Sequence, residues 1–259
     1  MRLLLASAII ATSAAATFLA VTSSASAETR SYALSGFTKI EAHAGFRIEF
    51  TQSPAWSVKV DSRFNNLDKI IVEKVGDTLR ISRPEGFCTG ISRISKDGPQ
   101  KQPKIHKEGC LDHEVEDVIT ISAPDLEALN LSAAISFTAA KLNVDKLSID
   151  GHAAVTVDID SLQVGNLDVQ LEAASKLMVA GACTRVDMNL GAATTVDTKN
   201  LKCREAHINA GVASKVEAFA SDKAVAKAGI STSIKVSGHP RDFQPSAQDR
   251  FGSSVSLAD

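Results

Sequence analysis

The chain has 259 residues, of which 44% are hydrophobic and only 5% aromatic, and its formal net charge at pH 7 is −2. So mild a charge gives no electrostatic basis for binding nucleic acid. Beyond the N-terminal region no apolar run approaches the roughly 18 residues that a membrane span needs. The length is sufficient for one well-filled core.

The N-terminal sequence MRLLLASAIIATSAAATFLAVTSSASA, residues 1–27, has the pattern of a secretory signal peptide. Arg2 gives a positive start, an apolar stretch runs from Leu3 to Val21, and Ala25-Ser26-Ala27 forms a cleavage site. We expect cleavage after Ala27 and a periplasmic or secreted bacterial protein; a retained membrane anchor is the alternative. The mature chain would carry 27 Lys and Arg against 30 Asp and Glu, a net charge of −3.

Residues 34–83 alternate between apolar and polar side chains, as in FTKIEAHAGFRIEFTQS and WSVKVDS. Alternation with period two predicts strands with one face toward a core. The Gly76-Asp77 pair predicts a turn between two of these strands. We interpret them as paired strands that cap the N-terminal end of the fold. Trp56 falls in the apolar phase and is expected in the core.

Residues 84–111 form an insertion whose Gly and Pro residues break regular structure. Within it, the segment from Phe87 to Cys110 has a charge of +3, which contrasts with the net negative charge of the whole chain. A solvated loop is one interpretation, and a contact patch for anionic envelope polymers is the other. The basic residues of this candidate contact loop are Arg93, Lys96, Lys101, Lys104 and Lys107.

The acidic segment DHEVED follows at residues 112–117. His and carboxylates could bind a divalent ion, but a strand points alternate side chains to opposite faces, which divides the set. We therefore favour an acidic strand that faces the basic insertion and assign no metal ligands. The chain also lacks common catalytic and nucleotide-binding motifs, so we assign no catalytic residue and no cofactor.

From about residue 120 onward a repeat of about 19 residues dominates the sequence. Each unit has an alternating run, a corner of small residues and a closing apolar residue. Such a period predicts a β-solenoid, while an antiparallel β-sandwich is the alternative. The sandwich would need hairpin turns of the Asn-Gly type, which residues 120–236 lack. The closing residues are Phe137, Val155, Leu177, Val196, Val216 and Ile234.

Equivalent positions should stack as ladders along the solenoid axis. One ladder carries hydroxyls and the next carries alternating lysines and hydroxyls. Hydrogen bonding along the axis is the favoured explanation for these ladders, and a ligand-binding strip is the alternative. The first ladder is Ser175, Thr194, Ser214 and Thr232, and the second is Lys176, Thr195, Lys215 and Ser233.

Four cysteines, an even number in an exported chain without a C-x-x-C pair, favour disulfides over metal ligands. Cys183 and Cys203 are one repeat apart, so adjacent turns would bring their Cα atoms to about 4.8 Å. A disulfide spans about 4.4–6.8 Å between Cα atoms, and this pair is predicted to form one. Cys88 and Cys110 bracket the insertion and are expected to pair with each other.

The order of SGFTKIEAHAGFRIEFTQS, LDKIIVEKVGDTLRIS and DVITISAPDLEALNLSAAISF resembles the head GIN domain family of auto-transporter adhesins. The matching pieces are Gly36-Phe37 with Ile40, Ile48–Gln52, Gly76–Ser82 and Pro124–Leu129, and the resemblance covers about residues 34–236. It implies an exported, β-helical, non-enzymatic domain and supplies no site residues. Ala133 and Ala134 depart from the family's Ser-Gly corner, and the segment from Phe87 to Gly109 is a long insertion.

The sequence thus predicts an all-β fold: a right-handed parallel β-solenoid of about six turns with an N-terminal strand cap, over residues 28–239. Residues 240–259 are expected to be a polar tail, with Phe243 and Phe251 docked over the last turn. The expected function is an exported, non-enzymatic, adhesin-like binding or structural module whose partner is an envelope polymer or surface protein. A β-helical carbohydrate-active enzyme is the alternative, which the shortage of aromatic residues disfavours.

Overall fold

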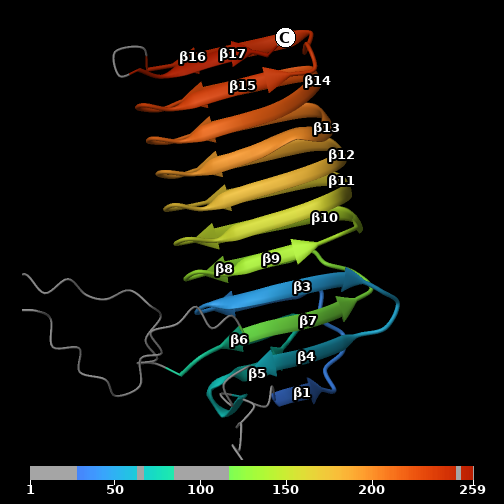
Figure 1. Ribbon diagram of the computed structural model, residues 1–259. Coiled ribbons are helices and arrows are strands. Elements are labelled where there is room, and N and C mark those ends of the chain that lie inside the picture. Colours follow the sequence, from blue (N-terminus) through green and yellow to red (C-terminus); the bar gives the residue numbers. More distant parts are fainter. Residues whose placement is uncertain (1–27, 63–66, 85–116, 249–251, 259) are drawn as a thin grey trace, which may run out of the picture.

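Almost every regular element that the structure describes is a β-strand. The computed structural model describes residues 28–62, 67–84, 117–248 and 252–258, and shows turns of chain stacked along one axis (Figure 1). The elements are β1 (Glu28–Tyr32), β2 (Lys39–His43), β3 (Phe46–Gln52), β4 (Ser57–Ser62), the 3-10 helix η1 (Leu67–Lys69), β5 (Ile71–Val75), β6 (Thr78–Ser82), β7 (Asp117–Ala123), β8 (Ala128–Ser132), β9 (Ser136–Ala139), β10 (Leu142–His152), β11 (Thr156–Leu171), β12 (Lys176–Leu190), β13 (Thr195–Ala210), β14 (Lys215–Ala228), β15 (Ser233–Ser237), β16 (Asp242–Ala247) and β17 (Ser254–Leu257).

From β8 onward each strand pairs in parallel with the next turn of the chain. Leu167 of β11, for example, lies between Leu147 of β10 and Val186 of β12. Each turn contributes to two sheets. Sheet A contains β9, β15, β17 and the first halves of β11–β14, and sheet B contains β8, β16 and the second halves of β10–β14. Apolar side chains from both sheets are buried between them. The predicted parallel β-solenoid is therefore confirmed.

Tight corners join sheet B to sheet A, and alanine carries most of the left-handed backbone there. Gly211 and Gly229 lie just before two of these corners, and the close approach between turns explains their presence. A Cβ on Gly211 would lie 2.9 Å from the carbonyl oxygen of Gly191, and a Cβ on Gly229 would lie 2.8 Å from that of Gly211. The corner residues with positive φ are Ala133, Ala134, Ala153, Ala154, Ala173, Ala174, Ala193, Ala213 and Ser231.

The predicted hydroxyl ladder closes these corners from the inside. Ser175, Thr194, Ser214 and Thr232 are all buried. The Thr194 hydroxyl lies 2.9 Å from the Ser214 hydroxyl, and the latter also donates to the Gly191 carbonyl at 3.0 Å. Hydrogen bonding within the fold, the favoured explanation, therefore accounts for this ladder, because buried hydroxyls must find partners.

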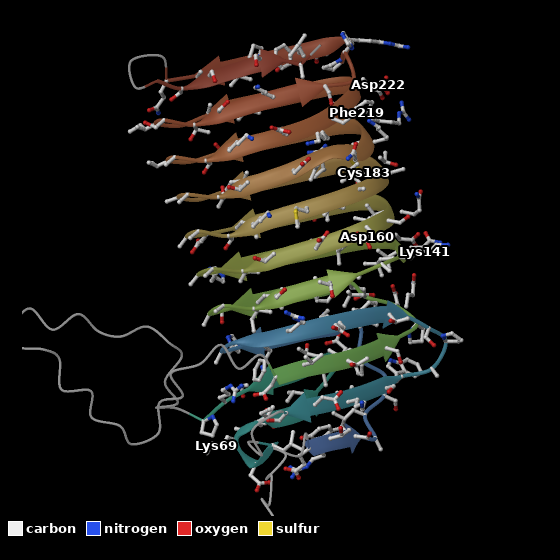
Figure 2. All side chains as sticks on the ribbon, viewed as in Figure 1. Lys69, Lys141, Asp160, Cys183, Phe219 and Asp222 are labelled. Atoms are coloured by element: carbon white, nitrogen blue, oxygen red, sulfur yellow. A yellow bond between two sulfur atoms is a disulfide. The ribbon has the colours of Figure 1, made fainter. Side chains whose placement is uncertain are left out.

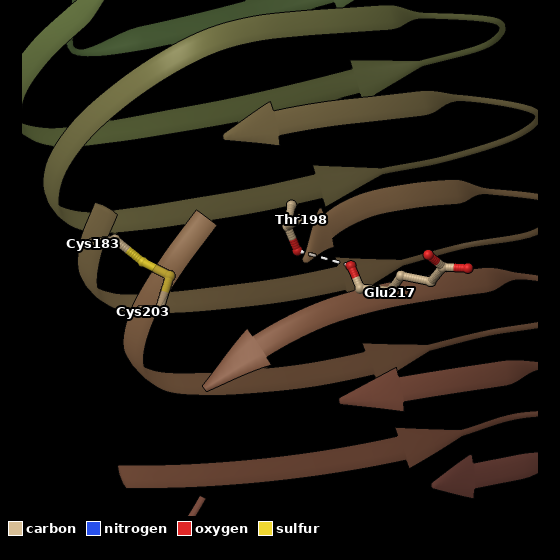
Figure 3. The surroundings of a disulfide bond; sticks show 4 residues. All are labelled: Cys183, Thr198, Cys203 and Glu217. Atoms are coloured by element: carbon tan, nitrogen blue, oxygen red, sulfur yellow. Dashed lines mark hydrogen bonds between the residues drawn. A yellow bond between two sulfur atoms is a disulfide. The ribbon is translucent and has the colours of Figure 1, made fainter. Parts of the chain in front are cut away.

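The predicted disulfide between neighbouring turns is present. Cys183 of β12 and Cys203 of β13 are register partners, their Cα atoms are 4.4 Å apart, and their sulfurs are bonded (Figure 3). Both side chains are buried where the coil bends from sheet A to sheet B. Cys88 and Cys110 lie outside the described residues, so their pairing stays a prediction.

We expect the double variant Cys183→Ala/Cys203→Ala to fold but to lose about 3 kcal/mol of unfolding free energy. The disulfide closes a loop with a sequence separation of 20 residues, and the chain-entropy model gives about this cost. Urea unfolding followed by far-UV circular dichroism measures it. An unchanged midpoint and slope would contradict the expectation.

The N-terminal section departs from the prediction, because only part of it is a cap. β2 pairs in parallel with β6 and β8 in sheet B, and β3 pairs in parallel with β7 and β9 in sheet A. The β2–β3 turn is thus a full turn of the solenoid, inserted between β6–β7 and β8–β9, and its corner residue Ala44 has a φ of 79°. Among the described strands, only β1, β4 and β5 make all of their pairings antiparallel, and they form the cap.

The C-terminal segment also differs from the expected tail. β16 pairs with β14 and β17 pairs with β15, both in parallel, so much of residues 240–259 adds another turn. Phe243 packs partly buried against the core, while Phe251 lies outside the described residues. Toward this end the core narrows because alanine replaces larger residues, at Ala206, Ala210, Ala224, Ala226 and Ala228.

Candidate functional site

A shallow groove lies on the outer surface of sheet A, over β12, β13 and β14. Parallel pairing aligns its side chains, since Lys176 lies opposite Thr195 and Thr195 opposite Lys215. The second predicted ladder therefore exists, and unlike the hydroxyl ladder it faces outward. The groove is lined by Lys176, Met178, Thr195, Val196, Asp197, Lys199, Lys215 and Glu217.

Ion pairs across the turns organise the groove. The Lys199 ammonium lies 2.8 Å from Asp197 and 3.1 Å from Glu217, and Lys215 reaches the other oxygen of Glu217 at 3.0 Å. One turn earlier in the chain, the hydroxyl of Thr198 donates to the backbone carbonyl of Glu217 at 3.3 Å (Figure 3). Hydrogen bonds from Lys215 and then Lys199 hold the pKa of Glu217 below its ordinary value. The bond to Asp197, followed by that to Glu217, raises the pKa of Lys199.

The lowered pKa of Glu217 predicts a contribution to stability that acid removes. Since the folded-state pKa lies below the unfolded value of about 4.3, the contribution is present above that value and disappears as pH falls through the lower folded pKa. We expect the melting temperature of wild type to exceed that of Glu217→Gln at pH 7. This difference in melting temperature should disappear below about pH 4. Thermal melts of both proteins over pH 3–7 measure this; a gap that widens in acid would contradict it.

Chemically, the groove suits binding better than bond breaking. Its lysines and hydroxyls are donors, and they recur at the sheet spacing of about 4.8 Å along the axis. Lys176 has no ion pair among the residues that the structure describes. A linear ligand with regularly spaced hydroxyl or anionic groups could contact several turns at once. Within the described ranges, no cluster of three or more His, Cys, Asp or Glu side chains is arranged to hold a metal.

A second cluster on sheet B brings together two histidines that are distant in the sequence. His43, Ser132 and His152 are register partners in three neighbouring turns. The Nδ1 atom of His43 lies in hydrogen-bonding contact with the Ser132 hydroxyl, and its Nε2 is 3.0 Å from Glu41. Hydrogen bonding to His43 is the largest cause of the lowered pKa of Glu41.

His152 instead lies between two carboxylates, with Nε2 3.0 Å from Asp150 and Nδ1 3.0 Å from Glu172. The 20-residue spacing of Ser132 and His152 was visible in the sequence. The place of His43 was not, because it depends on the inserted β2–β3 turn. The cluster lies on an outward sheet face.

The basic contact loop predicted from sequence stays a prediction, because Arg93, Lys96, Lys101, Lys104 and Lys107 lie outside the described residues. Its attachment is described, however. β6 ends and β7 begins at the edge of the solenoid where the corners of the later turns lie (Figure 1). Of the acidic segment, only Asp117 is described, and it is buried against Arg83 rather than presented to solvent.

The prediction for Trp56 was wrong, since its side chain is 40% exposed. The residue precedes β4 rather than lying within it, and its indole N–H donates to the Phe37 carbonyl at 3.2 Å.

The edge of the solenoid opposite the corners, where the coil bends, carries Lys141, Asp160, Phe219 and Asp222 (Figure 2). There the Lys202 ammonium lies 4.1 Å from the centre of the Phe219 ring.

These features define a β-solenoid that presents ladders of side chains on flat outer faces. The family described as "Putative auto-transporter adhesin, head GIN domain" matches residues 36–240. The chain therefore belongs to this family, as the sequence resemblance implied. No curated protein matches the chain.

Solved structures share the fold at low identity. A putative adhesin from Bacteroides fragilis is 20% identical with a TM-score of 0.68, covering 90% of this chain and 96% of that one. A putative adhesin from Parabacteroides merdae is 12% identical with a TM-score of 0.62, covering 90% and 96%. A putative lipid binding protein from Parabacteroides distasonis is 18% identical with a TM-score of 0.59, covering 90% and 97%. In the described part of this chain, no helix has the length and apolar character needed to cross a bilayer.

Proposed function

We propose that the protein is an exported, non-enzymatic envelope module that binds a linear, hydroxyl-rich or anionic polymer along the groove of sheet A. The alternation of Lys176, Thr195 and Lys215 on successive turns carries this proposal. Side chains repeated at one spacing along an axis can contact a ligand that itself repeats, and such contacts add through multivalency. The adhesin family to which the chain belongs supports a role in binding at the cell envelope.

The lowered pKa of Glu217 supports binding over catalysis. A general acid at neutral pH needs a raised pKa, whereas lysines lower the pKa of Glu217. Glu217 therefore differs from the catalytic acid of a glycosidase, whose active site holds a pair of carboxyl groups of which one is protonated. The carbohydrate-active enzyme of the sequence analysis gains no support from this site.

A glycan array that includes acidic envelope polysaccharides tests the proposal. We expect wild type to bind at least one linear polymer and Lys176→Ala/Lys215→Ala to lose most of that binding. Lys227→Ala is the matched control, because Lys227 is exposed on sheet B and removing it should change little. Equal loss in the control, or equal binding by all three proteins, would overturn the assignment of the groove.

A form without residues 89–109 tests the contact loop separately. If the basic residues of the loop bind the polymer, this form should lose binding while the groove stays intact. Unchanged binding by the loop-deleted form, with loss in the groove variant, would assign binding to the groove alone. The reverse pattern would move the site to the loop.

A further inference from the structure

The two ends of the solenoid are built differently. At the N-terminal end, β1 and β4 extend sheet A and β5 extends sheet B, all in antiparallel pairing. Leu67 and Ile70, in and just after η1, are buried at 1% and 5% exposure. This end of the core is therefore covered by the chain's own residues, which is how solenoids avoid end-to-end association.

At the C-terminal end, by contrast, the structure describes no covering element. β16 and β17 pair only with the turn beneath them. Their inward side chains are left partly open: Leu257 is 44% exposed, whereas Val236, its partner one turn below, is fully buried. Val255 and Phe243 are likewise only partly buried.

The backbone of β17 also presents free hydrogen-bonding groups. The amide of Ser254 donates to the Thr232 carbonyl at 2.9 Å, and that of Ala258 donates to Val236 at 2.8 Å. Alternate residues of a strand bond to opposite sides, so the amides and carbonyls of Val255 and Leu257 face away from β15. In β16 the outward position falls on Pro245, which has no amide hydrogen. The open edge suited to pairing is therefore β17.

We infer that this end is an interface with a second copy of the same chain, in which the two β17 strands pair antiparallel about a two-fold axis at Ser256. In this register Val255 of one copy lies opposite Leu257 of the partner copy, and each exchanges both backbone hydrogen bonds with it. The same pairs bring the partly exposed apolar side chains into one continuous core. Ser256 then lies opposite Ser256 of the second copy as a non-hydrogen-bonded pair.

Charge does not oppose this contact, and symmetry limits it to two copies. β17 carries no charged residue, although exposed edge strands commonly carry charges that prevent association. A head-to-tail contact would need an open N-terminal end, which is covered, so the contact is the same patch on both copies and closes as a dimer. The narrowed core makes the interface small, and we expect an equilibrium that depends on protein concentration.

Cysteine cross-linking tests the register. In the proposed dimer the two Cα atoms at position 256 are about 4.5 Å apart, within the range of a disulfide, whereas the two at position 254 are about 13 Å apart. We expect Ser256→Cys to form a covalent dimer under mild oxidation and Ser254→Cys, equally exposed on the same strand, to form none. Peptide mass spectrometry identifies the joined cysteines.

A charge variant tests the dimer without new thiols. In one copy, Ser256→Glu places a carboxylate beside Lys235, its register partner on β15, and should leave the fold intact. In the dimer it places two carboxylates opposite each other, so we expect the dissociation constant to rise at least tenfold, a cost of about 1.4 kcal/mol. Sedimentation equilibrium over a concentration series measures both proteins. Monomeric wild type at all concentrations, or cross-linking at 254 equal to that at 256, would overturn the inference.

Discussion

Replacing Gly181 by alanine is expected to destabilise the protein by about 3 kcal/mol or more. Gly181 lies in β12 at the bend of the coil, where the register with β11 and β13 shifts. Its φ is +131°, and a Cβ there would lie 1.9 Å from the carbonyl oxygen of Leu162 in the turn below. The backbone conformation and the close approach both exclude a side chain.

The overlap between an alanine Cβ at position 181 and the Leu162 carbonyl oxygen cannot be relieved locally, because this oxygen belongs to the backbone of a neighbouring turn. Moving Leu162 would disturb its pairing with Leu142, which lies one turn further down. The strain should therefore spread along the axis rather than stay at one bend. We expect the loss to include weaker protection of amides in β11 and β12 from hydrogen exchange.

Gly76→Ala is the matched control for this variant. Gly76 also has a positive φ, +62°, but its Cβ would meet nothing within 4 Å. It should cost only the left-handed conformation, about 1–2 kcal/mol. Urea unfolding of both variants measures the difference. A Gly181→Ala protein as stable as Gly76→Ala would show that the approach of the two turns is not limiting.

Local patterns in the sequence were sufficient to predict the regular, repeating part of the fold. Period-two alternation fixed which side chains face inward, and the repeat of about 19 residues fixed which of them stack. Together they predicted the Cys183–Cys203 pair and both ladders. They worked because each of these contacts joins successive turns, so that register follows directly from spacing.

Contacts between segments that are not successive turns of the solenoid could not be predicted in the same way. The β2–β3 turn lies between β6–β7 and β8–β9, so its partners are distant in the chain and spacing gives no register. The column of His43, Ser132 and His152 was missed for this reason. The extra C-terminal turn had a signal, the alternation of Ser254-Val255-Ser256-Leu257, which is short and polar enough to resemble a tail.

The second large effect is expected at a buried ion pair between Arg83, which follows β6, and Asp117, which begins β7. Arg83 and Asp117 contact each other through Nη2 and Oδ2, and their side chains are only 5% and 0% exposed. Arg83 also donates from Nε to the Ala44 carbonyl at 3.2 Å and lies 4.7 Å from the centre of the Phe46 ring. The pair thus ties the base of the insertion to the neighbouring turn.

We expect Asp117→Ala to cost about 3–5 kcal/mol, because it leaves the guanidinium of Arg83 buried without its carboxylate. The double variant Arg83→Met/Asp117→Ala should be more stable than this single variant, since it removes the buried charge as well. Asp168→Ala is the control: its pair with Lys146 spans 3.4 Å between side chains that are 42% and 65% exposed, and should contribute less than about 1 kcal/mol. Urea unfolding of wild type, the two single variants and the double variant measures these differences in unfolding free energy. A double variant that is less stable than Asp117→Ala would mean that packing, rather than the loss of the ion pair, sets the cost.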